Sequence, residues 1–181
     1  MVAAALSLGA GTVSAQASIR VTSDNVRLNN YLHDLAGPGA LVGIVGGSLL
    51  DQVRNKHGSF DDGVNGFAQQ IAARAGEAAV QVSVRHGLAA LMHRSTGYQP
   101  CHCHGFGPKV EHAFLETFTD RRPDGTRALA VPDFAGAYAG SFASLAWRHD
   151  RNVGDALIGT TLSFGFSALF NVARELTGLA H

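Results

Sequence analysis

Small residues recur at every fourth position in four separate stretches, and no other feature constrains the fold of this chain as strongly. Positions four apart lie on one ridge of an α-helix. A ridge without large side chains lets a second helix approach until the two backbones nearly touch. Each Gly inside a helix costs roughly 0.5–1 kcal/mol relative to Ala, so the rows favour a packing role. The four rows are Gly39, Gly43 and Gly47; Ala75, Ala79, Ser83 and Gly87; Gly136, Gly140 and Ser144; and Gly159, Ser163 and Ser167.

The fold class that these rows predict is mainly α. We expect about five helices packed closely on Gly/Ala/Ser ridges, with little or no sheet. The helices are expected near 39–50, 64–93, 109–119, 132–147 and 155–175. Residues 120–126 are typical of a turn, and 127–131 fit one short strand without an evident partner. The longest helix carries a polar stripe, formed by Gln70, Arg74, Glu77, Gln81 and Arg85.

The N-terminus is typical of an exported protein. Residues 2–15 are an uncharged apolar run of signal-peptide length that ends in the small-x-small pattern Val13-Ser14-Ala15. The basic segment that normally precedes such a run is missing, so we expect the true start to lie upstream; the alternative is a short helix of the mature fold. We therefore predict a signal peptide over 1–15, an irregular segment over 16–34 and a single helical domain over 35–181. The protein is expected in the periplasm or cell envelope of a bacterium.

The charge content argues against nucleic acid and leaves lipid open. Lys plus Arg and Asp plus Glu balance at 14 each, so no basic surface for a phosphate backbone is expected. Charged residues are 15% of the chain, below the roughly 25% of soluble domains. Residues 156–173 are uncharged over the lower limit of a membrane span, and 134–147 end in Trp147-Arg148 as an interfacial anchor does. The expected partners are membrane lipid or further copies of the chain, and a soluble bundle explains the same segments about as well.

Both cysteines lie in one short run, Cys101-His102-Cys103-His104. Such ligands attract zinc or copper, and His112 on the next predicted helix is a fifth candidate ligand. The usual zinc pattern needs a second, distant ligand pair, which is only loosely available here. The alternatives are a Cys101–Cys103 disulfide, favoured by an oxidising compartment, and an exposed loop with no task.

No sequence motif fixes a reaction. Asp133 and Asp155 begin predicted helices, where capping explains them without function. Glu111, His112 and Glu116 are the one dispersed cluster that a catalytic site could use. We therefore predict a non-enzymatic cell-envelope protein that associates with a membrane or with itself through small-residue helix faces. The alternative is a metal-binding or thiol-redox protein that uses the Cys-His run.

Several stretches between residues 66 and 175 carry a likeness to other proteins, among them GLAALMH at 87–93, FAGAY at 134–138 and FNVARE at 170–175. On these stretches the chain resembles a family of uncharacterised exported bacterial proteins. Family members often carry an acidic residue and a Pro-Arg-Tyr run after the long helix, where this chain has residues 94–98. The resemblance implies export and helices. It implies no activity, because none is assigned to the family.

Overall fold

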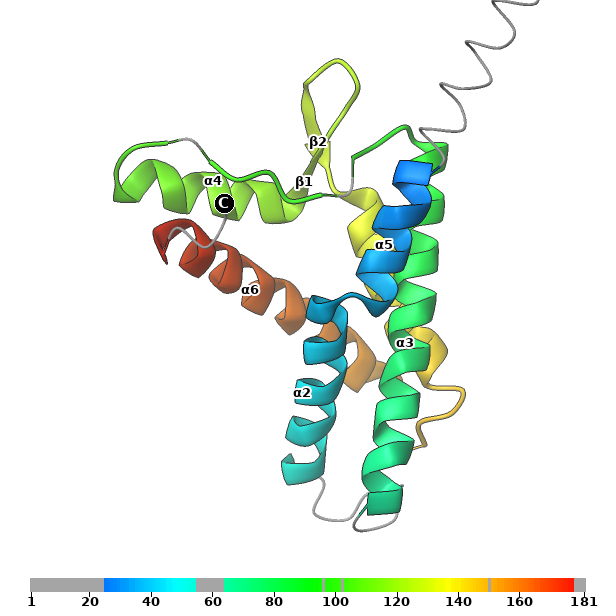
Figure 1. Ribbon diagram of the computed structural model, residues 1–181. Coiled ribbons are helices and arrows are strands. Elements are labelled where there is room, and N and C mark those ends of the chain that lie inside the picture. Colours follow the sequence, from blue (N-terminus) through cyan, green and yellow to red (C-terminus); the bar gives the residue numbers. More distant parts are fainter. Residues whose placement is uncertain (1–24, 55–63, 96, 102, 150, 178–181) are drawn as a thin grey trace, which may run out of the picture. The chain divides into compact units, whose positions relative to one another are not determined.

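The computed structural model describes residues 25–54, 64–95, 97–101, 103–149 and 151–177. The expected mainly α fold is confirmed. Figure 1 shows helices α2 (Pro38–Arg54), α3 (Val64–Leu91), α4 (Phe106–Phe118), α5 (Val131–Ser144) and α6 (Val153–Thr177), with strands β1 (Thr119–Arg121) and β2 (Arg127–Leu129). The chain divides into two units, Met1–Val42 and Gly43–His181. The predicted signal peptide, 1–15, lies outside the described residues.

The first unit contains a helix that the sequence does not predict. Residues 25–36 are helical, whereas 16–34 were expected to be irregular. Leu28 and Leu32 are 55% and 51% exposed, so this helix has little of the buried apolar face that makes a helix recognisable from sequence. The second unit begins at Gly43, inside α2, so the predicted domain start at residue 35 lies within the first unit.

Helix α5 packs against α3 through two glycines, and the two helices run side by side (Figure 1). A Cβ atom at Gly136 would lie 2.7 Å from a main-chain oxygen of α3, and a Cβ atom at Gly140 would lie 2.8 Å from another. Side chains cannot approach a carbonyl oxygen so closely, so glycine permits this helix separation. Ser144, the next member of the row, is fully buried.

The polar stripe of α3 lies largely in this helix contact. Gln70 is 2% exposed, and Arg85 forms an ion pair with Asp133 at the start of α5. Glu77 Oε2 lies 3.7 Å from Nη1 of Arg151, in the segment that leads to α6. Two charged members of the stripe, Glu77 and Arg85, therefore form ion pairs with other parts of the protein.

Trp147 and Arg148, which were expected to resemble an interfacial anchor, also make contacts within the protein. The indole N–H of Trp147 donates a hydrogen bond to the carbonyl oxygen of Ala73 at 3.3 Å, and the ring lies against Gly76 of α3. Arg148 is 5% exposed. The indole N–H needs an acceptor, and the chain after α5 turns back onto α3 to supply one.

A short hairpin follows α4. Strand β2 pairs with β1 antiparallel, in the register Thr119 to Leu129, so the predicted strand has a partner in the stretch expected to be a turn. Gly125 adopts a left-handed φ of 80°, which favours glycine. The carboxylate of Asp124 accepts hydrogen bonds from the N–H and hydroxyl of Thr126 at 2.9 and 2.6 Å. These contacts fix the hairpin tip.

Three phenylalanines join α4, α5 and α6. The ring centroids of Phe134 and Phe164 are 4.5 Å apart, and those of Phe118 and Phe134 are 6.2 Å apart. Aromatic pairs at such distances contribute about 0.5–1.5 kcal/mol beyond their buried area. This cluster holds the three helices together beside a cavity.

Candidate functional site

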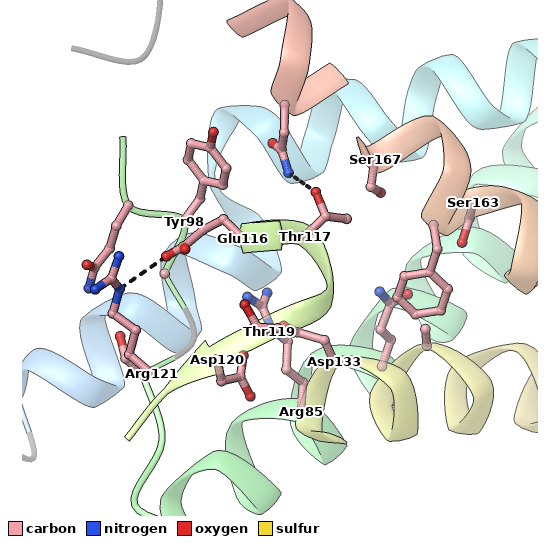
Figure 2. A pocket seen from close by; sticks show the side chains of 17 residues that line it. Arg85, Tyr98, Glu116, Thr117, Thr119, Asp120, Arg121, Asp133, Ser163 and Ser167 are labelled. Carbon is pink, nitrogen blue, oxygen red and sulfur yellow. Dashed lines mark hydrogen bonds and ion pairs between the residues drawn. The ribbon is translucent and has the colours of Figure 1, made fainter. Parts of the chain in front are cut away.

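A cavity of about 230 Å³ lies among α3, the hairpin, α4, α5 and α6 (Figure 2). Its wall is mostly polar, and the apolar side chains that line it are Ala137 and Phe164. The charged side chains in the wall come from α3, from the adjoining α4 and β1, and from α5. They are Arg85, Glu116, Asp120, Arg121 and Asp133.

Asp120 is the most unusual group in the wall. It is 6% exposed, and within the described part of the chain its Oδ2 atom is buried without a hydrogen-bond partner. Burial, and after it the neighbouring carboxylate of Asp133, raise the pKa of Asp120 to about 6, against the opposing charges of Arg94 and Arg85. Asp120 can therefore exchange a proton near neutral pH.

The other buried carboxylate of the wall, Glu116, is neutralised by arginines. Nε of Arg121 lies 3.5 Å from Glu116 Oε1, and Nη2 of Arg127 lies 3.1 Å from Oε2. Figure 2 shows Arg121 reaching Glu116 on one side of the cavity, while Asp120, Asp133 and Arg85 gather on another. Neither group is balanced by itself, because one carboxylate faces two arginines on the first side and two carboxyls face one arginine on the second; together, three acids face three arginines.

Helix α6 supplies a wall of neutral polar groups. Asn171 Nδ2 donates a hydrogen bond to the hydroxyl of Thr117 on α4 at 3.0 Å. Ser163 and Ser167, which the sequence predicts as packing residues, line the cavity. At Gly159, the first member of their row, an added Cβ would lie 3.1 Å from the guanidinium of Arg151. The small-residue row of α6 therefore lies beside the cavity and beside Arg151.

The two N-terminal rows have no helix backbone close beside their glycines in the described part of the chain. A Cβ at Gly39, Gly43 or Gly87 would meet nothing within 4 Å there, and one at Gly47 would approach the guanidinium of Arg74 at 3.3 Å. The other members of the second row, Ala75, Ala79 and Ser83, are exposed or half-buried. Their role in helix packing stays a prediction.

Glu175, near the end of α6, holds the Cys-His loop in place. Its Oε1 accepts hydrogen bonds from the Tyr98 hydroxyl and from the main-chain N–H of Cys101, both at 2.7 Å. Nδ1 of His112 lies 3.5 Å from the same oxygen. Burial and the bond to Glu175 hold the pKa of Tyr98 well above its usual range. The carboxylate thus joins α4, α6 and the loop.

The Cys-His loop contains a Cys101–Cys103 disulfide, one of the alternatives left open by the sequence. Neither cysteine is then available as a thiolate ligand for zinc or copper. His102 lies outside the described residues, His104 is exposed, and His112 faces Glu175. Over the residues that the structure describes, no group of three or more His, Cys, Asp or Glu side chains could hold a metal ion. The thiol-redox alternative stays a prediction.

Sequence reasoning missed the charged cavity. Asp133 was interpreted as a helix cap, Asp120 as a turn residue and Arg85 as part of a polar stripe. The closest signal was that stripe, whose last two members, Gln81 and Arg85, line the cavity. Asp155 does cap its helix, because it exchanges reciprocal hydrogen bonds with Asn152 at 2.9 and 3.1 Å.

The chain was compared with protein-family models, curated proteins and solved structures, and none of these matches it.

Proposed function

We propose that this chain is a non-enzymatic helical protein of the bacterial cell envelope that associates with a membrane through the outer face of α6. Export is supported by the signal-like residues 2–15 and by the resemblance to exported bacterial proteins. The single observation that carries the membrane contact is the distribution of side chains around α6.

Helix α6 exposes large apolar side chains that a surface helix of a soluble protein turns toward the core. Thr160, Asn171 and Glu175 face other parts of the protein. The large apolar side chains face outward, and six of them are between 44% and 69% exposed. These six are Leu157, Ile158, Leu162, Phe166, Leu169 and Phe170. An apolar surface of this extent marks a contact with a partner or a membrane.

The length of the uncharged run favours lipid as that partner. Residues 156–173 carry no charge and rise about 27 Å along a helix, close to the ~30 Å hydrocarbon thickness of a bilayer. Asp155 stands at one end of this run, and Arg174 and Glu175 at the other. Among the described residues, α6 is the helix that is long and apolar enough to cross a membrane.

The energy available from this face is sufficient for stable association. Full burial of a large apolar side chain contributes about 1.5–3 kcal/mol. Scaled by their exposed fractions, the six side chains together contribute on the order of 5–11 kcal/mol when they leave water. Among the described residues the buried apolar side chains are mostly small, chiefly alanines with Val82, so these six large apolar side chains of α6 are on its outer face rather than in the interior.

Flotation of the full chain with phosphatidylcholine vesicles, followed by a carbonate wash, tests the proposal. We expect the wild type to stay with the vesicles. Leu162→Asp and Phe166→Asp should each weaken partitioning by roughly 100-fold, because a carboxylate in hydrocarbon costs about 2.5–3.5 kcal/mol. Gln69→Asp, at an exposed position of α3, is the matched control and should float like wild type.

Self-association through the same face is the competing outcome. If the two α6 variants float unchanged but sediment as a smaller species than wild type, the face contacts another copy of the chain and the membrane proposal is wrong. Circular dichroism at 222 nm must show that each variant keeps its helices, so that a loss of binding is not a loss of fold.

A further inference from the structure

Two carboxylate oxygens at the cavity beside α6 receive no hydrogen bond from the part of the chain that the structure describes. Asp120 Oδ2 and Glu116 Oε2 are both buried, and in the described part of the chain neither accepts a hydrogen bond. Glu116 Oε2 has the cation of Arg127 at 3.1 Å, whereas the near neighbour of the Asp120 carboxyl is the carboxyl of Asp133, which offers a hydrogen bond only when a proton is shared between them. Buried polar atoms in native proteins nearly always have a partner. A molecule in the cavity that donates hydrogen bonds would supply one.

The charges around the cavity argue against a strongly charged occupant. Asp133 is paired with Arg85, and Glu116 with Arg121 and Arg127. An anion would meet the buried carboxyl of Asp120. A cation would meet the arginines that already pair with the acids. A neutral donor satisfies Asp120 without either conflict, because it adds no charge to a balanced site.

The remaining wall can both donate and accept. Gln81, Gln99 and Asn171 provide side-chain amides, and hydroxyl side chains such as Ser163 and Ser167 stand between them. Phe164 adds an apolar ring on one side. Amides and hydroxyls suit a ligand whose own groups act as donor and acceptor together, which is the property of a hydroxyl group.

The volume limits the size of the occupant. At about 230 Å³ the cavity is smaller than the roughly 300–1,000 Å³ of pockets that take drug-sized ligands. From the orphan acceptors, the balanced charge, the mixed neutral wall and this size, we infer that the cavity binds a compact, neutral, polyhydroxylated molecule of monosaccharide size. Asp120 would accept its hydroxyl hydrogens.

Saturation-transfer NMR on the full chain in detergent tests this inference, with glucose, galactose and myo-inositol as probes. At least one of them should show transfer with the wild type. Asp120→Asn should weaken its binding at least about tenfold, because a hydrogen bond to a charged acceptor is lost. Asp124→Asn is the matched control: it lies in the same hairpin outside the cavity wall and should bind like wild type.

The inference is overturned if none of the three probes shows transfer, or if Asp120→Asn binds as well as wild type. It is also overturned if ethylamine shows transfer that Asp120→Asn abolishes while the three polyols show none, since the cavity then takes a cation. Asp120→Asn removes a buried charge and should fold at least as stably as wild type at neutral pH. A loss of binding is therefore separable from a loss of fold by its unfolding midpoint.

Discussion

Replacement of Gly140 by Ala is expected to push α5 away from α3. The added Cβ would stand 2.8 Å from the carbonyl oxygen of Glu77 and 2.9 Å from Cβ of Gln81. Rotation of a flexible side chain cannot remove either contact, so the helices must separate by several tenths of an ångström. Overpacking of this kind costs about 1–3 kcal/mol. Ala gains about 0.8–1 kcal/mol over Gly in helix propensity, which offsets part of the loss.

Gly87→Ala is the matched control, because it makes the same chemical change inside α3. A Cβ at Gly87 meets nothing within 4 Å among the described residues, so only the propensity gain applies. The two variants should therefore differ by the packing cost alone, about 1–3 kcal/mol. For a chain of this size that is roughly 2–12 °C in Tm, with Gly140→Ala the lower.

Thermal unfolding followed by circular dichroism at 222 nm measures this difference in one detergent and at one protein concentration. The reasoning is refuted if Gly140→Ala is as stable as Gly87→Ala, since the glycine row of α5 would then have no role in close packing. The fluorescence of Trp147, which lies against α3, gives a second reading of the same helix contact.

Three further outcomes are expected. The raised pKa of Asp120, about 6 against an ordinary 3.8, favours its protonated form in the folded state, so its stabilising contribution is complete below about pH 4 and is lost as pH rises through 6. The stability of Asp120→Asn relative to wild type should therefore rise by roughly 2–3 kcal/mol between pH 4 and 7.5, as measured by denaturant unfolding. Glu175→Ala should lose about 3 kcal/mol or more, because the Tyr98 hydroxyl and the Cys101 N–H lose their acceptor. Glu175→Gln keeps a carbonyl oxygen and should lose less than half of that, and equal losses for the two variants would contradict the account. A mass increase of two hydrogen atoms on reduction with dithiothreitol should identify the Cys101–Cys103 disulfide, and no increase would mean that the loop holds free thiols.

The sequence predicted helices α2 to α6 because their signals are local, whereas it did not predict the helix over residues 25–36. Apolar spacing, Pro132 near the start of α5 and the cap formed by Asn152 and Asp155 all act within a few residues. The small-residue rows show where such prediction ends. Gly87 and Gly140 both belong to rows with the same spacing, yet of the two only Gly140 meets a second backbone in the described part of the chain. Whether a row packs against another helix depends on the path of the chain between the helices. The spacing of small residues does not determine that path.

The cavity could not be predicted from the sequence, for the same reason. Asp120 lies in the first strand of the hairpin, and Asp133 follows its second strand in the sequence. The hairpin segment was expected to be a turn followed by an unpaired strand. Pairing of β1 with β2 brings the two carboxylates together, and α3 then adds Arg85. Each residue has an ordinary local explanation, as a cap or a surface charge. Only when the fold brings these residues together do they form part of a cavity wall.

Fluorescence quenching by lipid tests most directly whether the outer face of α6 contacts a membrane. In a Trp147→Phe background, which removes the single tryptophan, Phe166→Trp places a probe on the outer face, where the native side chain is 69% exposed. Phe164→Trp places one two residues away, on the face that packs against Phe134. In vesicles of dibrominated phosphatidylcholine we predict strong quenching at position 166 and weak quenching at 164. Equal quenching at both positions, or none at 166, would contradict the account.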